Sequence, residues 1–500
     1  MTGRILAIDR GTTNVKAGLF DEGCEEVFSV TVPNDPPIAP REDWREADME
    51  RMWRTAAAAI GRVLAAGYKA HDIEAVSLAG QGNGLMLVDA AGRPVRNGIL
   101  SVDRRCAGIV GEWQADGRLA AVLPVLRLPL NAGSTAPLLA WLARHEPEAL
   151  AKAKHLLFSK DWIRLRLTGE LATDYTDASG GGLLEHASQG YARRALGELG
   201  LGGALALLPP LRDSSAEGGR VTAEAAAITG LREGTPVFVG AHDICACHNG
   251  IATLSATALL SIFGTWAASL VVVEDTCQIP VVINHPEHGH FLTGAGDANA
   301  GACLDATIDA LFAHESAQCR AAGESIHAAL EKELSPTGRN RLLFVPHMFG
   351  HALDPNATGS ILGLRGRIDR LEVLKAVYEG IVLGQCAYLT ALPQLGAMDE
   401  IWLAGGGAKS GLVGQIMADA LGREVRVAAC ENMVGRGAAI SAMLGLGRAH
   451  TLGELPRPRL ARSFQPVAGM RSYYGAKLQL IASRLQQGEP AAAALAAIEG

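Results

Sequence analysis

Asp9, Gly11, Thr12, Thr13 and Lys16 stand close together near the start of the chain, and their types suit phosphate and metal binding. A turn with one glycine and two hydroxyl residues exposes backbone N–H groups that can hold an anion. A carboxylate before the turn can bind a divalent cation, and a lysine after it supplies a point charge for phosphate. An ordinary surface hairpin with a glycine turn is the alternative interpretation.

Gly264 and Thr265 repeat this pattern in the second half of the chain. An apolar run precedes them and another follows, as around Gly11. Gly11 and Gly264 are 253 positions apart (264 − 11) in a chain of 500 residues. Repetition at half the length indicates two similarly folded domains, each with one phosphate-binding hairpin.

Asp243 follows an apolar run over residues 237–240 that predicts a buried strand. Phosphoryl transfer from ATP requires held phosphate oxygens, Mg²⁺ to neutralise charge, and a carboxylate that orients the acceptor hydroxyl. We therefore expect Asp243 to be the catalytic base, and Asp9 and Asp243 to lie at the Mg²⁺. The alternative role of Asp243 is a helix cap or turn residue.

Gly405, Gly406, Gly407 and Ser410 stand between a predicted strand and a predicted helix. Glycines let a flat ligand approach the backbone, and the helix N-terminus lies nearby. These residues are expected to face the adenosine side of ATP. A plain strand-to-helix connection is the alternative, and the sequence contains neither the dinucleotide fingerprint nor a P-loop.

Gln81 and Asn83 lie in a glycine-rich loop that follows a strand predicted over residues 73–79. Their amides can bond sugar hydroxyls as donor and acceptor at once, whereas a simple turn would also use glycine and asparagine. Asp103 and Arg105 stand before a predicted helix. They form either a charged helix cap or a pair that holds a polyol.

Composition sets the broad class. The chain is too long for one core, and its 48% hydrophobic and 19% charged residues are ordinary for a soluble globular protein. A net charge of −7 without a basic stretch argues against nucleic acid, and no apolar run has membrane length. The first strand begins almost at once, so no signal peptide is expected.

The nine cysteines have no framework spacing, which predicts reduced thiols and a cytoplasmic location. Cys245 and Cys247 lie beside two histidines and superficially offer zinc ligands. A structural zinc site normally has two separated ligand pairs, and no second pair is evident. Small buried apolar residues are the preferred interpretation of both cysteines.

These motifs together resemble the FGGY family of carbohydrate kinases over nearly the whole chain. The matching segments are residues 9–16, 240–243, 264–266, 359–364, 376–380 and 405–410. The resemblance implies an α/β protein of two actin-like ATPase (ribonuclease H-like) domains with an interdomain active-site cleft. The expected domains are residues 1–238 and 239–500, with ATP and Mg²⁺ as cofactors and Asp243 as the base.

Within the family, the loops over residues 82–85 and 99–105 are most similar to those of L-xylulose/3-keto-L-gulonate kinases. This resemblance implies that a sugar or polyol meets Gln81, Asn83, Asp103 and Asp243, with Arg105 a lesser candidate. D-xylulose kinases and erythritol kinases are the alternatives within the family. A non-catalytic actin-like sugar sensor is the alternative of another class, and a homodimer is one option for the oligomeric state.

Overall fold

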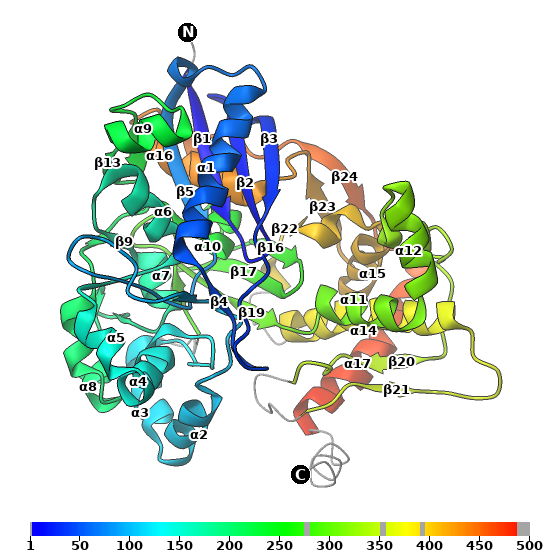
Figure 1. Cartoon of the computed structure of the whole chain (residues 1–500). Helices are drawn as coiled ribbons and strands as arrows, with labels where there is room; N and C mark the ends of the chain where they lie inside the picture. Colours follow the sequence, from blue (N-terminus) through cyan, green and yellow to red (C-terminus); the bar gives the residue numbers. More distant parts are fainter. Residues whose placement is uncertain (1–2, 275–280, 351–356, 391–395, 488–500) are drawn as a thin grey trace. The chain divides into compact units, whose positions relative to one another are not determined.

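The computed structural model describes residues 3–274, 281–350, 357–390 and 396–487 (Figure 1). The chain divides into two compact units, and each is built around one mixed β-sheet with helices. The first unit comprises Met1–Leu254, Val272–Thr293 and Asn432–Pro458, and the second comprises Ser255–Val271, Gly294–Glu431 and Arg459–Gly500. The predicted α/β class with two domains is confirmed, whereas the predicted boundary after residue 238 stays a prediction.

The sheet of the first unit has the order β13-β14-β5-β1-β2-β3, and β15 also pairs with β5. Its strands are β1 (Arg4–Arg10), β2 (Asn14–Phe20), β3 (Glu26–Pro33), β5 (Ile73–Gly80), β13 (Glu217–Arg220), β14 (Pro236–Phe238) and β15 (Ala241–His242). The apolar run of β1 is completely buried. The strands of the predicted opening hairpin are therefore a central part of the sheet, whereas Thr12 and Thr13 of its turn are exposed.

Helices cover both faces of this sheet (Figure 1). They are α1 (Met49–Ala65), α6 (Ser159–Thr168), α9 (Ala223–Thr229), α10 (Asp243–Asn249) and α16 (Met433–Gly445). Leu6 and Ile8 of β1 share one core cluster with Trp53 of α1 and Trp162 of α6. Alternate residues of a strand point to opposite faces. The other face of β1 and β5 contacts α16, which packs in turn against α10.

The smaller elements of the first unit lie outside its main sheet, and many of them contribute to a second apolar cluster. They are α2 (Ala107–Ala115), α3 (Arg118–Leu126), α4 (Thr135–His145), α5 (Pro147–Lys152), α7 (Tyr175–Gly180), α8 (Arg193–Glu198), β4 (Glu46–Ala47), β6 (Met86–Val88), β7 (Gly98–Ile99), β8 (His155–Leu157), β9 (Thr173–Asp174), β10 (Leu184–Glu185), β11 (Gly190–Tyr191) and β12 (Leu211–Arg212). Short antiparallel pairs such as β6 with β8 tie this part to the loops that leave the main sheet.

The second sheet has the order β18-β19-β17-β16-β22-β23-β24. Its strands are β16 (Ala258–Phe263), β17 (Ala267–Val273), β18 (Ile283–Asn284), β19 (Phe291–Asp297), β22 (Glu400–Ala404), β23 (Val425–Ala428) and β24 (Leu460–Phe464). By residue range, β18, the end of β17 and the start of β19 belong to the first unit, and the rest of this sheet belongs to the second. The second unit also contains β20 (Leu343–Val345), β21 (Ser360–Leu362), α11 (Gly301–Leu311), α12 (Ala313–Ala322), α13 (Ile326–Glu331), α14 (Arg370–Thr390), α15 (Gly411–Leu421) and α17 (Ala468–Gln487). One core cluster joins this sheet with α11, α14, α15 and α17.

Parallel pairing decides where the loops of each sheet emerge. In the first sheet Arg10 and His242 each pair with Gly80, so β1, β5 and β15 end at the same edge. In the second sheet Ile262 pairs with Ala404, so β16 and β22 also end together. Ligands of α/β proteins bind at such carboxyl ends.

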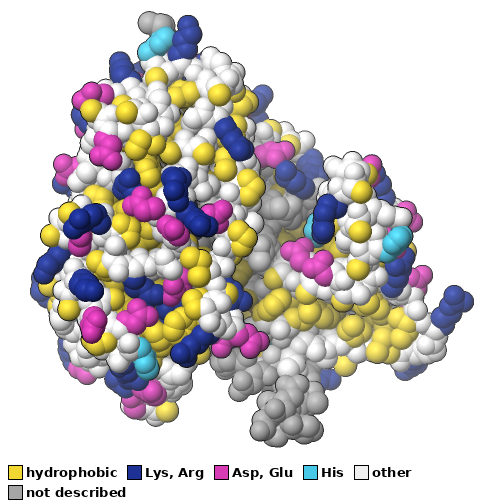
Figure 2. All heavy atoms as spheres, in the orientation of Figure 1, with side chains coloured by type: hydrophobic (Ala, Val, Ile, Leu, Met, Phe, Trp, Pro, Cys, Tyr) yellow, Lys and Arg dark blue, Asp and Glu magenta, His cyan; other side chains and the backbone are white. Residues whose placement is uncertain are grey.

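The surface charges, the helices and the cysteines can each be compared with the expectations from composition. Positive and negative side chains are interspersed on the face that Figure 2 shows. Among the helices described, none has both the length and the apolarity needed to cross a bilayer. None of the eight described cysteines forms a disulfide bond, and Cys277 lies outside the described residues. Cys245 and Cys247 are buried.

The contact of α10 with α16 requires a glycine. A Cβ on Gly437 would lie 1.7 Å from the carbonyl oxygen of Ala246, whereas a Cβ on Gly61 of α1 would meet no atom within 4 Å. We expect Gly437→Ala to lower the free energy of unfolding by about 3 kcal/mol, because the helices must separate. The matched Gly61→Ala should raise it by about 0.5–1 kcal/mol. Urea unfolding checks both, and equal effects would contradict this account of the contact.

Candidate active site

The opening hairpin places Asp9 and Lys16 directly opposite each other on β1 and β2. Thr12 and Thr13 of the turn between them are exposed. The side-chain amide of Asn34 donates hydrogen bonds to the carbonyl oxygens of Gly11 and Thr12, at 2.9 and 3.0 Å. These bonds hold the turn carbonyls from one side, so the structure brings the predicted phosphate and metal residues of the first hairpin together.

Asp9 is a buried carboxylate with spare bonding capacity. It is 7% exposed, and its Oδ1 has no hydrogen-bond partner among the described residues. Burial raises the pKa of Asp9 to about 6, although the positive charges of Lys16 and Arg10 oppose this shift. An acceptor oxygen buried without a donor is suited to a cation.

Asp243 is the first residue of α10, at the end of β15. One of its oxygens, Oδ1, lies 2.7 Å from the backbone nitrogen of Ile244 and 3.3 Å from Nε2 of His242. Burial raises the pKa of Asp243 to about 6; His242 opposes the shift and the charge of Asp9 adds to it. The two predicted metal residues therefore lie close enough to repel each other.

A divalent cation fits this pair. Mg²⁺ usually binds one or two carboxylates and completes its shell with water and substrate phosphates. Asp9 and Asp243 supply that number of carboxylates, and a cation would relieve both their repulsion and the burial of the unpartnered Oδ1 of Asp9. The described residues contain no group of three or more acidic, histidine or cysteine side chains suited to a metal.

A buried relay of hydrogen bonds lies behind His242 and Asp243. The backbone N–H of His242 donates to Oγ1 of Thr176 at 2.8 Å, and the Thr176 hydroxyl donates to Asp174 at 2.5 Å. Nζ of Lys160 lies 3.0 Å from the same Asp174 carboxylate. The relay joins α6 and α7 to the start of α10 and fixes the backbone from which the Asp243 side chain projects.

Lys160 is the centre of a completely buried charge cluster. Its Nζ contacts Asp161 at 2.8 Å and both Asp174 and Asp177 at 3.0 Å, and Arg164 lies 3.5 Å from Asp161. Burial raises the pKa of Asp177 well above its usual range, and the positive charge of Lys160 opposes this shift. The sequence showed these residue types but gave no signal of their pairing, because residues 160 and 174 meet only in the folded chain.

Gln81 and Asn83 follow β5 at the same edge. Both polar atoms of the Gln81 side chain and Oδ1 of Asn83 are buried without hydrogen-bond partners in the described part of the chain. A Cβ on Gly82 would lie 2.5 Å from the His242 ring, so this loop passes directly over the residue before Asp243. Buried polar groups are normally satisfied. These amides therefore have the character expected of ligand-binding groups.

Asp103 is differently placed. Its Oδ1 accepts from the backbone and Nε of Arg105, both at 2.9 Å, and its Oδ2 accepts from Arg105 Nη2 at 2.8 Å and from the backbone of Arg45 at 2.6 Å. The Arg105 guanidinium also stacks on Trp44 at 4.0 Å. Because a carboxylate accepts about four hydrogen bonds, the geometry favours a structural role, and direct sugar contact by Asp103 stays a prediction.

The second unit brings the predicted nucleotide residues together. Gly264 and Thr265 follow β16, and Gly405 follows the parallel strand β22. Two hydrogen bonds hold the carbonyl groups of Gly264 and Thr265 in place. The backbone N–H of Gly301, at the start of α11, donates to the Gly264 carbonyl at 3.0 Å, and the N–H of Ala302 donates to the Thr265 carbonyl at 3.1 Å. The two loops thus emerge side by side at one edge of the sheet.

The glycine triplet is shaped by its contact with β16. Gly405 has a φ of +81°, and a Cβ there would lie 2.8 Å from the carbonyl oxygen of Phe263. A Cβ on Gly407 would meet the Phe263 side chain at 2.7 Å, whereas Gly406 faces open space. Ser410 caps α15, because its hydroxyl accepts from the backbone of Val413 at 3.0 Å. The hydroxyl retains its own hydrogen for a ligand.

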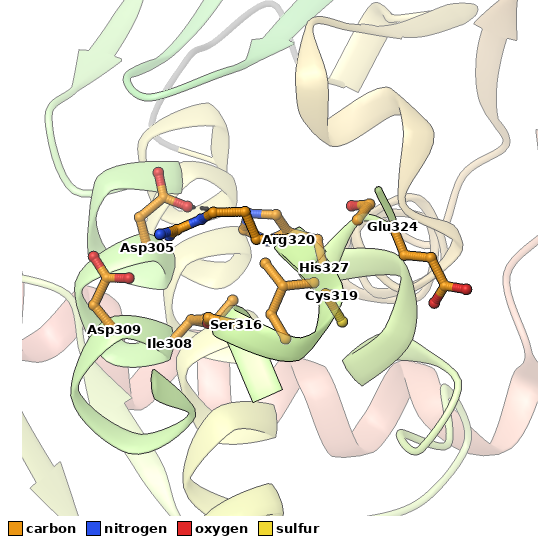
Figure 3. Close-up of a pocket in the computed structure, with 10 residues that line it drawn as sticks. Asp305, Ile308, Asp309, Ser316, Cys319, Arg320, Glu324 and His327 are labelled. Atoms are coloured by element: carbon orange, nitrogen blue, oxygen red, sulfur yellow. Dashed lines mark ion pairs between the residues drawn. The ribbon is translucent and has the colours of Figure 1, made fainter. Parts of the chain in front are cut away.

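A cavity of about 470 Å³ lies elsewhere in the second unit, among α11, α12 and α13 (Figure 3). Asp305 and His327 form an ion pair of 3.2 Å on its wall, and Arg320 and Cys319 also line it. None of the predicted site residues does so, and the cavity is separate from the loops described above.

The raised pKa values of Asp9 and Asp243 predict that the free energy of unfolding depends on pH. An unfolded aspartate has a pKa near about 3.9, so between this value and about 6 the folded state binds more protons and loses stability as pH rises. We expect Asp9→Asn and Asp243→Asn each to gain stability over the parent, by about 1 kcal/mol more at pH 7.5 than at pH 5. Urea unfolding in metal-free buffer measures this gain.

The exposed Asp116 is the control for this experiment. Hydrogen bonds from Arg118 lower the pKa of Asp116, so Asp116→Asn should show no gain that grows with pH. A gap between parent and Asp9→Asn or Asp243→Asn that stays constant from pH 5 to 7.5 would show that these carboxyls are not perturbed.

Comparison with known proteins assigns the family. The N-terminal and C-terminal domain models of the FGGY carbohydrate kinases match residues 4–250 and 259–446. The L-xylulose/3-keto-L-gulonate kinase of Escherichia coli (strain K12) is 28% identical over 463 residues, which cover 91% of each chain. The xylulose kinase of Bacillus subtilis (strain 168) is 29% identical over 482 residues, or 93% of each.

Solved structures agree with this assignment. The crystal structure of xylulose kinase from Rhodospirillum rubrum has a TM-score of 0.82 at 25% sequence identity, and the match covers 96% of this chain and 98% of that one. The actin-like fold and the two family domains are both present in one chain. The protein therefore belongs to the FGGY family of carbohydrate kinases, and it is a sugar kinase that uses ATP as its phosphoryl donor.

Proposed function

We propose that the chain transfers the γ-phosphate of ATP to a hydroxyl of a ketopentose-type sugar, L-xylulose or a related ketose, with Asp243 as the general base. The main support is the position of Asp243 at the sheet edge, beside Asp9 and under the loop that carries the unpartnered amides of Gln81 and Asn83. A base, a metal ligand and hydroxyl-binding groups thus belong to one edge of the first unit.

The chemistry of Asp243 suits a base. A pKa near about 6 leaves the carboxylate ionised at neutral pH, yet makes it more basic than an ordinary aspartate. The relay through Thr176 fixes the backbone of the preceding residue, and positioning of this kind supplies much of the rate in phosphoryl transfer.

Asp9 and Asp243 would hold Mg²⁺, and Lys16 would attract phosphate from the strand opposite. When bound, the metal neutralises charge on the phosphate oxygens. In the proposed role, the turn of Gly11, Thr12 and Thr13 and the turn of Gly264 and Thr265 bind the phosphates, and residues Gly405, Gly406, Gly407 and Ser410 bind the adenosine side. The observed support is the exposure of the first turn and the adjacency of the two loops in the second unit.

The choice of sugar rests on relatives of low identity. The names of the relatives in Escherichia coli and Bacillus subtilis concern L-xylulose, 3-keto-L-gulonate and xylulose. D-xylulose and four-carbon polyols such as erythritol are the alternatives, since sugar choice depends on pocket shape. A homodimer and the cytoplasmic location stay predictions.

Replacement of Asp243, the proposed base, tests the proposed kinase function. Wild-type protein with Mg-ATP should release ADP only with a suitable sugar from a panel of L-xylulose, D-xylulose, L-ribulose, 3-keto-L-gulonate, erythritol and glycerol. Asp243→Asn should lower kcat by about 10³-fold, because the hydroxyl proton loses its acceptor. Asp116→Asn, on an exposed loop, should keep wild-type activity.

Three results would contradict the proposal. Full activity of Asp243→Asn would remove Asp243 as the base. Sugar-independent ATP hydrolysis would favour another actin-like ATPase. Tight sugar binding without a phosphorylated product would favour a sensor.

The relay behind Asp243 predicts a second kinetic effect. Thr176→Val removes the acceptor of the His242 N–H and the donor to Asp174. We expect kcat to fall about 10- to 100-fold with little change in the KM for ATP, because a small misplacement of the base is costly. Thr176→Ser, which keeps the hydroxyl, should restore most of the rate.

Thr229→Val is the matched control, since Thr229 is also buried and its hydroxyl donates to the carbonyl of Ala225 and accepts from the backbone of Leu231, neither of which belongs to the relay. Equal losses in Thr176→Val and Thr229→Val, or no recovery in Thr176→Ser, would assign Thr176 to general stability.

A further inference from the structure

Asn34 lies just beyond β3 and makes three hydrogen bonds to the turn of the opening hairpin. Its side-chain amide donates to the carbonyl oxygens of Gly11 and Thr12, at 2.9 and 3.0 Å. Its backbone N–H donates to the carbonyl oxygen of Thr13 at 2.9 Å. One residue thus binds three successive carbonyl groups, although it lies 23 and 22 positions from Gly11 and Thr12 in the chain.

A bound carbonyl group also fixes the N–H group of the next residue. A peptide group is planar, and in its trans form the C=O and N–H bonds point in opposite directions. The peptide groups of this segment are trans. The carbonyls of Gly11 and Thr12 therefore point toward Asn34, whereas the N–H groups of Thr12 and Thr13 point away from it.

These two N–H groups are available to a ligand. Thr12 and Thr13 are exposed, and within the described ranges their backbone N–H groups donate no hydrogen bond to the protein. Successive N–H groups on one side of a turn form a concave site suited to an anion. The carbonyl oxygens, which would repel an anion, are turned to Asn34 on the other side.

The second predicted phosphate turn has the same arrangement with other donors. As described above, the carbonyls of Gly264 and Thr265 accept from two backbone N–H groups at the start of α11. Backbone donors of this kind are not removed by changing a side chain. In the first turn, by contrast, two of the three donors belong to the Asn34 side chain, so one substitution releases two of the three carbonyl groups.

The hairpin itself does not depend on the Asn34 side chain. β2 pairs with β1 from Val15 to Phe20 and with β3 from Asn14 to Phe20, and these ladders hold the strands in register. The side-chain bonds of Asn34 reach only the turn beyond the ladders. Their effect is therefore on the orientation of the turn and not on the pairing of the strands.

We propose that Asn34 is a positioning residue for nucleotide binding, which holds the carbonyls of Gly11 and Thr12 so that the N–H groups of Thr12 and Thr13 meet the phosphates of ATP. This inference rests on the proposed function, in which this turn binds phosphate. Asn34 acts only through the turn. Because the turn is ordered before the nucleotide arrives, less conformational entropy is lost on binding.

Binding of adenine compounds with and without phosphate tests this role. Asn34→Leu has a similar side-chain shape without the donors, and it retains the backbone bond to Thr13. Titration calorimetry measures the Kd of Mg-ADP and of adenosine for both proteins. We expect the Kd of Mg-ADP to rise about tenfold in Asn34→Leu, because two hydrogen bonds that order the turn are lost, and the Kd of adenosine to change less than about twofold.

Kinetics and a conservative variant add two readouts that general destabilisation would not move in this way. The KM for ATP should rise about tenfold in Asn34→Leu, whereas the KM for the sugar should stay within about twofold. Asn34→Gln retains the amide on a longer side chain, so it should recover part of the affinity for Mg-ADP.

Asp21→Ala is the matched control for the loss of turn bonds. Oδ1 of Asp21 accepts from the backbone N–H groups of Gly23 and Glu25, at 2.9 and 3.0 Å, in the turn at the other end of β2. Asp21 is half-buried, as Asn34 is. Urea unfolding should show similar losses of stability in Asp21→Ala and Asn34→Leu, yet Asp21→Ala should keep the Kd of Mg-ADP within about twofold of the wild type.

The outcomes separate this inference from the proposed function. If the wild type prefers Mg-ADP to adenosine and Asn34→Leu keeps that preference, Asn34 does not position the turn, and the proposed function stands. Equal weakening of Mg-ADP and adenosine in Asn34→Leu, or a weakening of Mg-ADP in Asp21→Ala as large as in Asn34→Leu, would assign the effect to general stability.

A wild type that binds Mg-ADP no more tightly than adenosine would contradict the phosphate role of the turn, and with it both the inference and the proposed function. If the wild type binds Mg-ADP but releases no ADP from ATP with any sugar, the proposed function fails, whereas the calorimetry still decides the role of Asn34.

Discussion

The candidate site depends on the parallel pairing of β5 with β1 and β15. This register places the ends of the three strands at one edge, and with them Asp9, Gln81 and Asp243. A slip of β5 by one residue would turn its side chains to the opposite faces and would shift Gln81 relative to Asp9 and Asp243. The buried apolar runs that precede these polar residues fix the register, so the core of the first unit also specifies the site.

The buried charged groups of the first unit occur in two arrangements, one with ion pairs and one with unpartnered atoms. Around Lys160, every cation faces carboxylates at ion-pair distance, and the cluster holds α6 and α7 against the start of α10. At the sheet edge, Asp9, Arg10 and Gln81 each keep a polar atom without a partner. Unsatisfied groups of this kind reduce stability. Their concentration at one edge is the expected mark of a ligand site, although Asp177 and Arg164 of the Lys160 cluster also keep buried polar atoms without a hydrogen-bond partner.

Much of this arrangement could be predicted from local sequence. Strand, glycine turn and strand recur around Gly11 and Gly264, and each turn is found where the pattern places it. The expected helix after the glycine triplet is α15 (Gly411–Leu421). Asp103 shows the limit of local reasoning. From sequence, Asp103 belongs either to a charged cap or to a polyol-binding pair, and only the folded structure shows that its oxygens accept hydrogen bonds from Arg45 and Arg105.

Arg10 could not be singled out from the sequence, although it lies inside the most informative motif. From sequence, Arg10 is simply the last residue of a predicted strand, and an arginine at a strand end is ordinarily expected to be solvated. In the structure, however, Arg10 is buried, so its guanidinium lies in low-polarity surroundings that lower its pKa. Gln81 and Asn83 could be proposed from residue type and position in the sequence, whereas the missing partners of their buried polar atoms are visible only in the folded chain.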